Sequence, residues 1–228
     1  MKTKTKSTRI IVSVFLVLTM LLSIPVVAYG TTGGDGWKKE VTGLFFSSPT
    51  TTYTYRNYKV KINNNNNVYN GKAHTCDVKV KKDKKTLEKG KDYKISYKNN
   101  KKVGNATLTI KFIKKHKKIK SCIHKFVIVP RAPKISNLVY HKKTLKVSFL
   151  VQRYAEADKV KWSLIKDGET IKEASFTKKS DKVTPDAKLA SGVRYHLRAE
   201  SIKGNIASFN SHVRFTIEPK THKIIIDK

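Results

Sequence analysis

Lysine is the residue type in this sequence with the most evident chemical role, which is ionic attraction to anions. It supplies most of a very large positive charge. The 228 residues include 49 Lys and Arg against 16 Asp and Glu, a formal net charge of +33. Lys supplies 42 of these cations and Arg only 7. Arg reads phosphate or guanine with two hydrogen bonds, whereas Lys is a hydrated point charge. The composition therefore predicts nonspecific attraction to polyanions and argues against sequence-specific nucleic-acid recognition.

The lysines are densest in two runs, at 79–85 and 111–120. Residues 57–130 contain 21 Lys, no Arg and 4 acidic residues, a net +17, whereas residues 131–217 have a net +10. Such runs cannot all face inward in a sheet, so they predict a broad cationic face on the first domain. The alternative is charge that only keeps the protein soluble. The predicted polyanion-binding residues are Lys79, Lys81, Lys82, Lys84, Lys85, Lys114, Lys115, Lys117 and Lys118.

The chain has two cysteines, Cys76 and Cys122. An even number in an exported protein favours a disulfide. Cys76 shares strand parity with Val80, and Cys122 shares it with Phe126, so both side chains are expected to face one core. The sequence predicts a Cys76–Cys122 disulfide, and two buried thiols are the alternative. No His or Cys lies at ligand spacing from either one, so no metal site is expected.

Catalytic patterns are lacking. Acidic residues are sparse, and no pair of them suggests general acid–base work. His116 and His124 are expected to be solvated surface residues, because His116 lies in a Lys-rich turn. Ser191-Gly192 lacks the surroundings of a nucleophile elbow. We expect no enzyme activity and no cofactor.

Four aromatic residues near the start of the first domain give a second ligand class to consider. Trp37, Tyr53, Tyr55 and Tyr58 are candidates for a platform that binds carbohydrate. Packing into the core is the more ordinary role of such scattered rings, and both interpretations remain open from the sequence.

The N-terminus predicts export. A basic segment at residues 2–9 precedes an apolar stretch at 10–27, and the small residues Ala28 and Gly30 follow as a cleavage site. This order is typical of a secretory signal peptide over residues 1–30. The alternative is an uncleaved anchor, which is the only way we expect this protein to engage a membrane. The expected location is extracellular.

The rest of the chain predicts an all-β protein with two tandem sandwich domains, because short alternating segments are separated by Gly, Asn and Lys-rich turns. The predicted organisation is an extended leader (31–56), a first sandwich (57–130), a second sandwich (131–217) and a C-terminal tail (218–228). Pro130 and Pro133 mark a stiff linker between the two sandwiches. The predicted strands are 58–62, 76–80, 93–98, 106–113, 122–129, 134–138, 144–150, 159–166, 170–176, 194–201, 206–208 and 213–218.

The second sandwich has two local signatures. Asp167-Gly168 is a hairpin turn signal. Leu189, Gly192 and Tyr195 have the spacing of a tyrosine corner, in which a Tyr hydroxyl ties a loop to its own backbone. The predicted core of this domain is Phe149, Trp162, Leu164, Leu197 and Ala199.

Two resemblances support this organisation. Residues 69–128 resemble an immunoglobulin-like repeat of Gram-positive, especially clostridial, surface proteins. The motifs that carry the resemblance are Tyr69-x-Gly71-Lys72-Ala73, Lys85-Thr86-Leu87, Gly90-Lys91-Asp92-Tyr93, Ser96-Tyr97-Lys98-Asn99-Asn100, Val103-Gly104-x-Ala106 and Phe126. The chain after Pro133 is similar to a fibronectin type III domain, on Leu189, Gly192, Tyr195, Leu197 and Ala199. Phe149 stands where such domains usually carry a core Trp, and lysines replace the usual Gly-rich turn of the repeat.

Together these observations predict a secreted, non-catalytic surface protein, an adhesive or structural module held on anionic envelope or matrix polymers. One alternative is an accessory carbohydrate-binding protein of a secreted glycan-degrading system. Another is a nonspecific binder of extracellular DNA or glycosaminoglycan.

Overall fold

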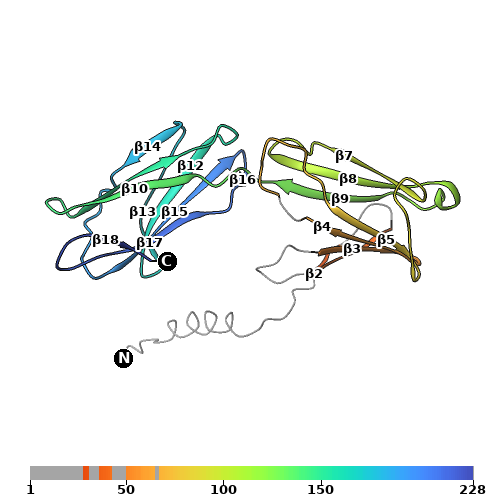
Figure 1. Cartoon of the computed structure of the whole chain (residues 1–228), viewed down its shortest axis with the longest axis horizontal. Helices are drawn as coiled ribbons and strands as arrows, with labels where there is room; N and C mark the ends of the chain where they lie inside the picture. The colour runs from red at the N-terminus through yellow and green to blue at the C-terminus, as the bar shows by residue number, and fades with distance from the viewer. Residues whose placement is uncertain (1–27, 31–35, 43–49, 65–66, 228) are drawn as a thin grey trace, which may run out of the picture. The chain divides into compact units, whose positions relative to one another are not determined.

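The computed structural model describes residues 28–30, 36–42, 50–64 and 67–227 (Figure 1). This part of the chain is all-β, with several antiparallel sheets and one 3-10 turn. The predicted signal peptide lies almost wholly outside the described residues. Within the described segments, no helix has the length and apolar character needed to cross a membrane.

The strands of the N-terminal half form two sheets. The first sheet has the order β1-β2-β3-β4-β5-β6 and the second has the order β7-β8-β9. Their bounds are β1 Ala28–Gly30, β2 Lys38–Thr42, β3 Thr50–Tyr55, β4 Tyr58–Asn63, β5 Asp77–Lys82, β6 Lys85–Thr86, β7 Tyr93–Lys98, β8 Gly104–Phe112 and β9 Cys122–Ile128. The 3-10 turn η1, Lys114–His116, lies between β8 and β9.

Two more sheets follow. One has the order β10-β11-β14, and the other has the order β13-β12-β15-β17-β18 with β16 added on β15. Their bounds are β10 Lys134–His141, β11 Lys146–Gln152, β12 Lys159–Lys166, β13 Glu169–Phe176, β14 Ser180–Val183, β15 Arg194–Lys203, β16 Ile206–Ala207, β17 Ser211–Ile217 and β18 Ile224–Ile226.

The described chain divides into two compact units. The first unit combines the described residues up to Asn64 with Cys76–Lys94 and Lys111–Cys122. The second combines those from Asn67 to Thr75 with Ile95–Ile110 and the chain from Ile123. The predicted linker lies inside the second unit, so the domain boundaries expected from the sequence stay a prediction.

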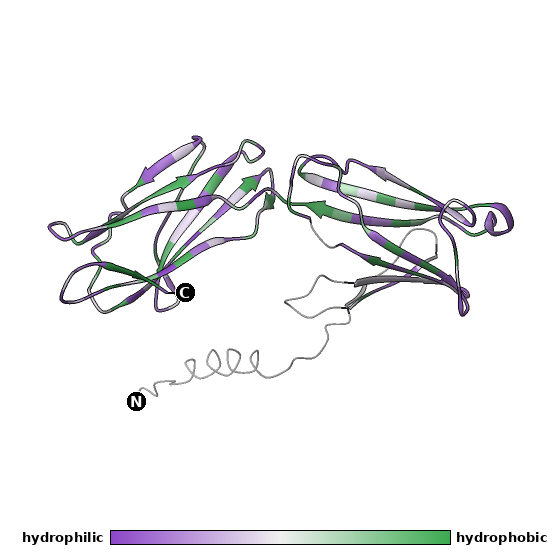
Figure 2. Ribbon diagram, in the orientation of Figure 1, coloured by the Kyte–Doolittle hydropathy of each residue, from purple (hydrophilic) through white to green (hydrophobic). Residues whose placement is uncertain are grey.

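Burial in the first unit follows strand alternation. On β4 the side chains of Tyr58, Val60 and Ile62 are buried, and the two lysines between them are exposed. Trp37 is also buried, and its ring stacks on Phe112 with centroids 5.9 Å apart. Each such apolar side chain contributes roughly 1.5–3 kcal/mol on burial. Figure 2 shows the resulting change between hydrophobic and hydrophilic residues along the strands.

The second unit contains a sandwich whose core agrees with the sequence prediction. Two of its sheets share one core, which includes all five predicted residues, Phe149, Trp162, Leu164, Leu197 and Ala199. The rings of Phe149 on β11 and Trp162 on β12 meet edge to face, with centroids 5.5 Å apart. Asp167 and Gly168 both have positive φ, at 49° and 86°, which is the backbone of the predicted two-residue hairpin turn.

Several strands differ from the sequence prediction. The leader 31–56 contains β2 and β3, which pair with each other and with β4. The tail 218–228 contains β18, which pairs with β17. β14 was also absent from the prediction. Thr51, Thr52 and Tyr53 of β3 are all buried, so this strand lacks the alternation on which the prediction depended.

Candidate polyanion-binding surfaces

The outer face of the first sheet gathers four lysines on two neighbouring strands. In the β4–β5 register, Lys59 lies opposite Lys81 and Lys61 lies opposite Lys79. The four side chains line one shallow depression, which we call the lysine square. Lys79 and Lys81 belong to the predicted set. Lys59 and Lys61 were missed, although the alternation of YKVKI places both on one face, because the sequence does not give the pairing of the strands.

The lysine square has an unfavourable electrostatic arrangement in the unliganded protein. Like charges placed directly opposite each other on adjacent strands destabilise a sheet. Among the described residues, no acidic side chain lies within salt-bridge distance of any of the four ammonium groups. A bound anionic polymer would relieve this repulsion, which makes the square a candidate binding surface.

A second group of lysines surrounds an open pocket beside η1. Lys82, Lys84 and Lys85 line this pocket together with Lys115. Lys82 lies on the opposite face of β5 from Lys81, and its Nζ sits over the ring of Tyr58, 5.9 Å from the centroid. The pocket thus brings Lys115, from the run at 111–120, together with three lysines from the run at 79–85.

Three predicted lysines remain, Lys114, Lys117 and Lys118. All three are exposed on the turn that contains η1 and do not line the pocket. The predicted set therefore divides into the lysine square, the η1 pocket and these exposed turn residues, rather than forming one continuous face.

His116 holds this turn in place and is buried, which corrects the expectation of a solvated surface residue. Its side chain is 3% exposed, its Nδ1 lies 2.8 Å from the hydroxyl of Tyr58, and its Nε2 lies 3.4 Å from Asp92 Oδ1. His124 is likewise buried. The burial of His116 could not be predicted from the lysine-rich sequence around it, because one residue of a short 3-10 turn faces inward while its neighbours remain in water.

The Asp92 carboxyl and the Tyr58 hydroxyl beside His116 both have shifted pKa values. The backbone N–H of Glu88 donates to Asp92 and is the main cause that lowers the pKa of this carboxyl, with His116 and nearby lysines adding to the effect. Burial is the main cause that raises the pKa of Tyr58. The phenol is therefore neutral and enclosed, and the arrangement is suited to fixing the lysine-bearing turn.

The two cysteines do not form the predicted disulfide in this structure; both are thiols. Cys76 donates to Asn64 Oδ1 at 2.8 Å, and Cys122 is fully buried. The inward parity of both side chains is as expected. Burial is the main cause that raises the pKa of Cys76 to about 11 and that of Cys122 to about 12. Such thiols contain little thiolate at neutral pH, the form needed for disulfide exchange.

The aromatic residues considered for carbohydrate binding are in the core. Trp37, Tyr53 and Tyr58 are buried, and Tyr55 is half-buried with its ring 5.3 Å from that of Trp37. Trp37 Nε1 also donates to the carbonyl of Lys120. The packing interpretation is therefore correct for these rings, and they form no exposed platform.

The residues predicted to form a tyrosine corner lie together. Ala190 N–H donates to the Tyr195 hydroxyl at 2.8 Å, and this hydroxyl in turn donates to Ala190 O at 3.4 Å. Ala190 lies between Leu189, which is buried in the core, and Gly192, whose φ of 77° suits glycine. The contact falls within the 189–192 segment that the sequence singles out.

No protein-family model matches this chain, and no curated protein matches it.

Proposed function

We propose that this is a secreted, non-catalytic protein of the cell surface or extracellular matrix. It binds anionic envelope or matrix polymers through lysines of its first unit. The observation that carries the proposal is the lysine square, in which four ammonium groups are held in opposed pairs with no acidic partner among the described residues. The lysines of the η1 pocket and of the turn add to the positive electrostatic potential of this unit.

We further propose that an immunoglobulin-like repeat is followed by a fibronectin type III-like domain. The second unit supports the latter part. A sheet of three strands, β10-β11-β14, faces a larger sheet with the central order β13-β12-β15-β17 across one core. The Tyr195 contact with Ala190 also suits such a domain. The N-terminal sequence supports export.

Binding measurements across a salt series test the proposal. The full chain should bind teichoic acid, heparin and DNA, with an affinity that falls steeply as salt rises from about 50 to 500 mM. Binding by the lysines is mainly screened Coulomb attraction, so these side chains by themselves should show little preference among polyanions of equal charge density. Aromatic-dependent binding to a neutral polysaccharide would instead favour the carbohydrate-binding alternative.

A matched pair of variants locates the binding surface. Changing Lys59, Lys61, Lys79 and Lys81 to Gln removes the lysine square. The control changes four exposed lysines of the second unit to Gln, namely Lys142, Lys143, Lys178 and Lys179. Both variants lose the same charge, but the first should reduce the slope of log affinity against log salt by about 3, since each contact contributes roughly 0.7–0.9. Equal losses in both variants would show that only net charge matters.

The turn lysines give an independent check. Charge reversal at Lys114, Lys115, Lys117 and Lys118 should weaken teichoic acid, heparin and DNA together, because all three ligands experience the same field. Binding that does not depend on salt would contradict the electrostatic account.

A further inference from the structure

The arginines of this protein are used differently from its lysines. Six of the seven arginines are in the described part of the chain. Four of these six have a specific protein partner: Arg56 lies over the Tyr55 ring, Arg131 pairs with Glu156, Arg153 donates to the Ala157 carbonyl, and Arg194 pairs with Asp227. The remaining two, Arg198 and Arg214, have no such partner among the described residues, and they lie on adjacent strands.

Two histidines complete the group. In the β15–β17 register, Arg198 lies opposite His212 and His196 lies opposite Arg214. The four side chains alternate with buried residues such as Leu197 and Phe215, so they share the outer face of the sheet. The rings of His196 and His212 meet on one diagonal, with centroids 5.5 Å apart and nearly perpendicular planes.

The two arginines occupy the other diagonal of this arrangement, which we call the arginine–histidine cluster. Diagonal neighbours on adjacent strands are about 7–8 Å apart, within reach of long side chains. Arg198 and Arg214 are both exposed, so their guanidinium groups are open to a ligand. Two forked donors can therefore converge on one oxyanion placed above the imidazole rings.

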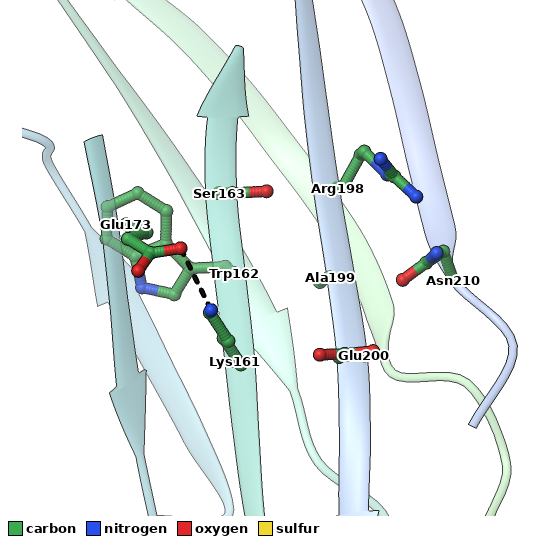
Figure 3. A pocket seen from close by; sticks show the side chains of 8 residues that line it. All are labelled: Lys161, Trp162, Ser163, Glu173, Arg198, Ala199, Glu200 and Asn210. Atoms are coloured by element: carbon green, nitrogen blue, oxygen red, sulfur yellow. Dashed lines mark ion pairs between the residues drawn. The ribbon is translucent and has the colours of Figure 1, made fainter. Parts of the chain in front are cut away.

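The charges around the cluster leave it cationic. Figure 3 shows the Arg198 side chain extending toward the strand that follows Asn210, away from the ion pair between Lys161 and Glu173. Glu200 lies two residues beyond Arg198 on the same face of β15, and both line a shallow pocket with Lys161 and Glu173. His196 Nε2 is shielded and has no hydrogen-bond partner among the described residues.

We propose that the arginine–histidine cluster is a binding site for a phosphodiester oxyanion of a flexible sugar-phosphate or glycerol-phosphate polymer. Guanidinium groups match the geometry of phosphate oxygens, and a protonated imidazole adds a further charge-assisted donor. The outer face of β15 and β17 carries no Phe, Tyr or Trp on which a base could stack, which favours such a polymer over nucleic acid. The site does not rest on the proposed function of the lysines, because it uses different residues in the second unit.

Histidine makes this site sensitive to pH. Burial is the main cause that lowers the pKa of His196, and the charges of Arg214, Arg198 and His212 lower it further. Arg194 also lies on this face, paired with Asp227, whereas the residue opposite His196 on β12 is the apolar Ile165. A lowered pKa means that the imidazole is neutral at pH 7.

A bound phosphodiester favours the charged imidazole, so binding takes up a proton. Affinity must therefore rise as pH falls through the range from about 7.5 to 5.5, where histidine titrates. The lysine square is lined by lysines alone and contains no histidine, so this source of pH dependence is missing there. The pH dependence separates the two sites.

The test uses the full chain and poly(glycerol phosphate) as the probe, by calorimetry at constant ionic strength near pH 5.5 and 7.5. Arg198→Gln and Arg214→Gln should each weaken binding at the lower pH by about tenfold, the loss typical of one charge-assisted contact. Arg194→Gln is the matched control, because it removes the same charge from the same face but its guanidinium is held by Asp227. It should change the affinity by less than about twofold.

The histidines are tested in the same assay. The double variant His196→Gln with His212→Gln should lose the gain in affinity at low pH while it retains the salt dependence. The variant without the lysine square should retain the gain at low pH, so failure of one site does not imply failure of the other. Unfolding midpoints of all variants confirm that they are folded.

Three outcomes would overturn the proposal. Equal losses in the variants at Arg194, Arg198 and Arg214 would mean that only general charge is involved. An unchanged pH dependence without His196 and His212 would remove the histidines from the site. Single-stranded DNA that binds as tightly as the polymer, with the same pH dependence, would contradict the assignment to a polymer without bases.

Discussion

Tyr195→Phe is the substitution that most directly tests the packing of the second unit. It removes one oxygen and leaves the ring, which stacks on Phe215 with centroids 5.6 Å apart. The lost oxygen accepts a hydrogen bond from Ala190 N–H at 2.8 Å and donates to Ala190 O at 3.4 Å. The free energy of unfolding therefore changes through this one link between β15 and the loop before it.

The size of the effect follows from the surroundings of the two partners. A net hydrogen bond contributes about 0.5–1.5 kcal/mol, and a buried donor left without an acceptor costs about 1–3 kcal/mol. Tyr195 is buried but Ala190 is exposed, so water can replace part of the lost contact at the N–H. We expect a loss of about 1 kcal/mol, or somewhat more.

Tyr140→Phe supplies the matched control. Its hydroxyl donates to the carbonyl of Leu189 at 3.3 Å, in the same loop, from a half-buried ring. This longer and more solvent-exposed hydrogen bond should contribute about 0.5 kcal/mol or less to the free energy of unfolding. Urea denaturation of the full chain measures both, and a loss of about 1 kcal/mol corresponds to a midpoint shift near 0.5 M for a typical slope of about 2 kcal/mol/M. An unchanged midpoint for Tyr195→Phe, or equal shifts for both variants, would refute the reasoning.

Three further predictions concern the first unit and the N-terminus. His116→Ala should destabilise the protein by about 2 kcal/mol, because a buried hydroxyl loses its partner, while Lys117→Ala on the same turn should stay within about 0.5 kcal/mol in urea denaturation. Cys76 and Cys122, with pKa values raised to about 11 and 12, should be alkylated slowly near pH 7 and faster as pH rises; mass spectrometry that finds a disulfide in the native protein would contradict this. The exported protein should begin close to Ala28 or Gly30 in N-terminal sequencing, and an intact Met1 would refute cleavage.

Strands with strict alternation were predictable from the sequence. The bounds of β7 and β12 agree with the prediction at both ends, and β4 extends one residue beyond it. β12 reads KVKWSLIK, with every second residue facing the core, so its period and face follow from the sequence. The same rule located the five core residues of the second sandwich.

Strands without alternation were missed for identifiable physical reasons. β3 reads TTTYTY and buries three consecutive residues, so no period of two appears. β14 reads SDKV and buries only Val183. β18 is three consecutive isoleucines at the edge of a sheet. Pairing with a neighbouring strand, which no local pattern reveals, is what makes each of these segments a strand.

The candidate sites depend on information that no single segment contains. Consecutive residues on a strand face opposite sides, so the run from Lys79 to Lys82 is divided between two faces, with Lys81 in the lysine square and Lys82 beside Tyr58. Lys59 and Lys61 join the square only through the register of β4 on β5. A run of like charge in a sequence thus indicates a charged protein but not a binding face.

Lysine and arginine differ in how they are placed on this protein, and composition alone does not explain the difference. A general bias toward lysine accounts for many lysines scattered over a surface, and the control lysines of the second unit fit that description. It does not account for scarce arginines left without protein partners on diagonal positions of adjacent strands, with histidines on the other diagonal. Such an arrangement places two guanidinium groups on neighbouring strands without a carboxylate partner among the described residues, which costs stability in the unliganded protein. A ligand that supplies negative oxygen atoms removes this cost, and this is why we expect the arginine–histidine cluster, rather than the lysines alone, to give the protein selectivity among polyanions.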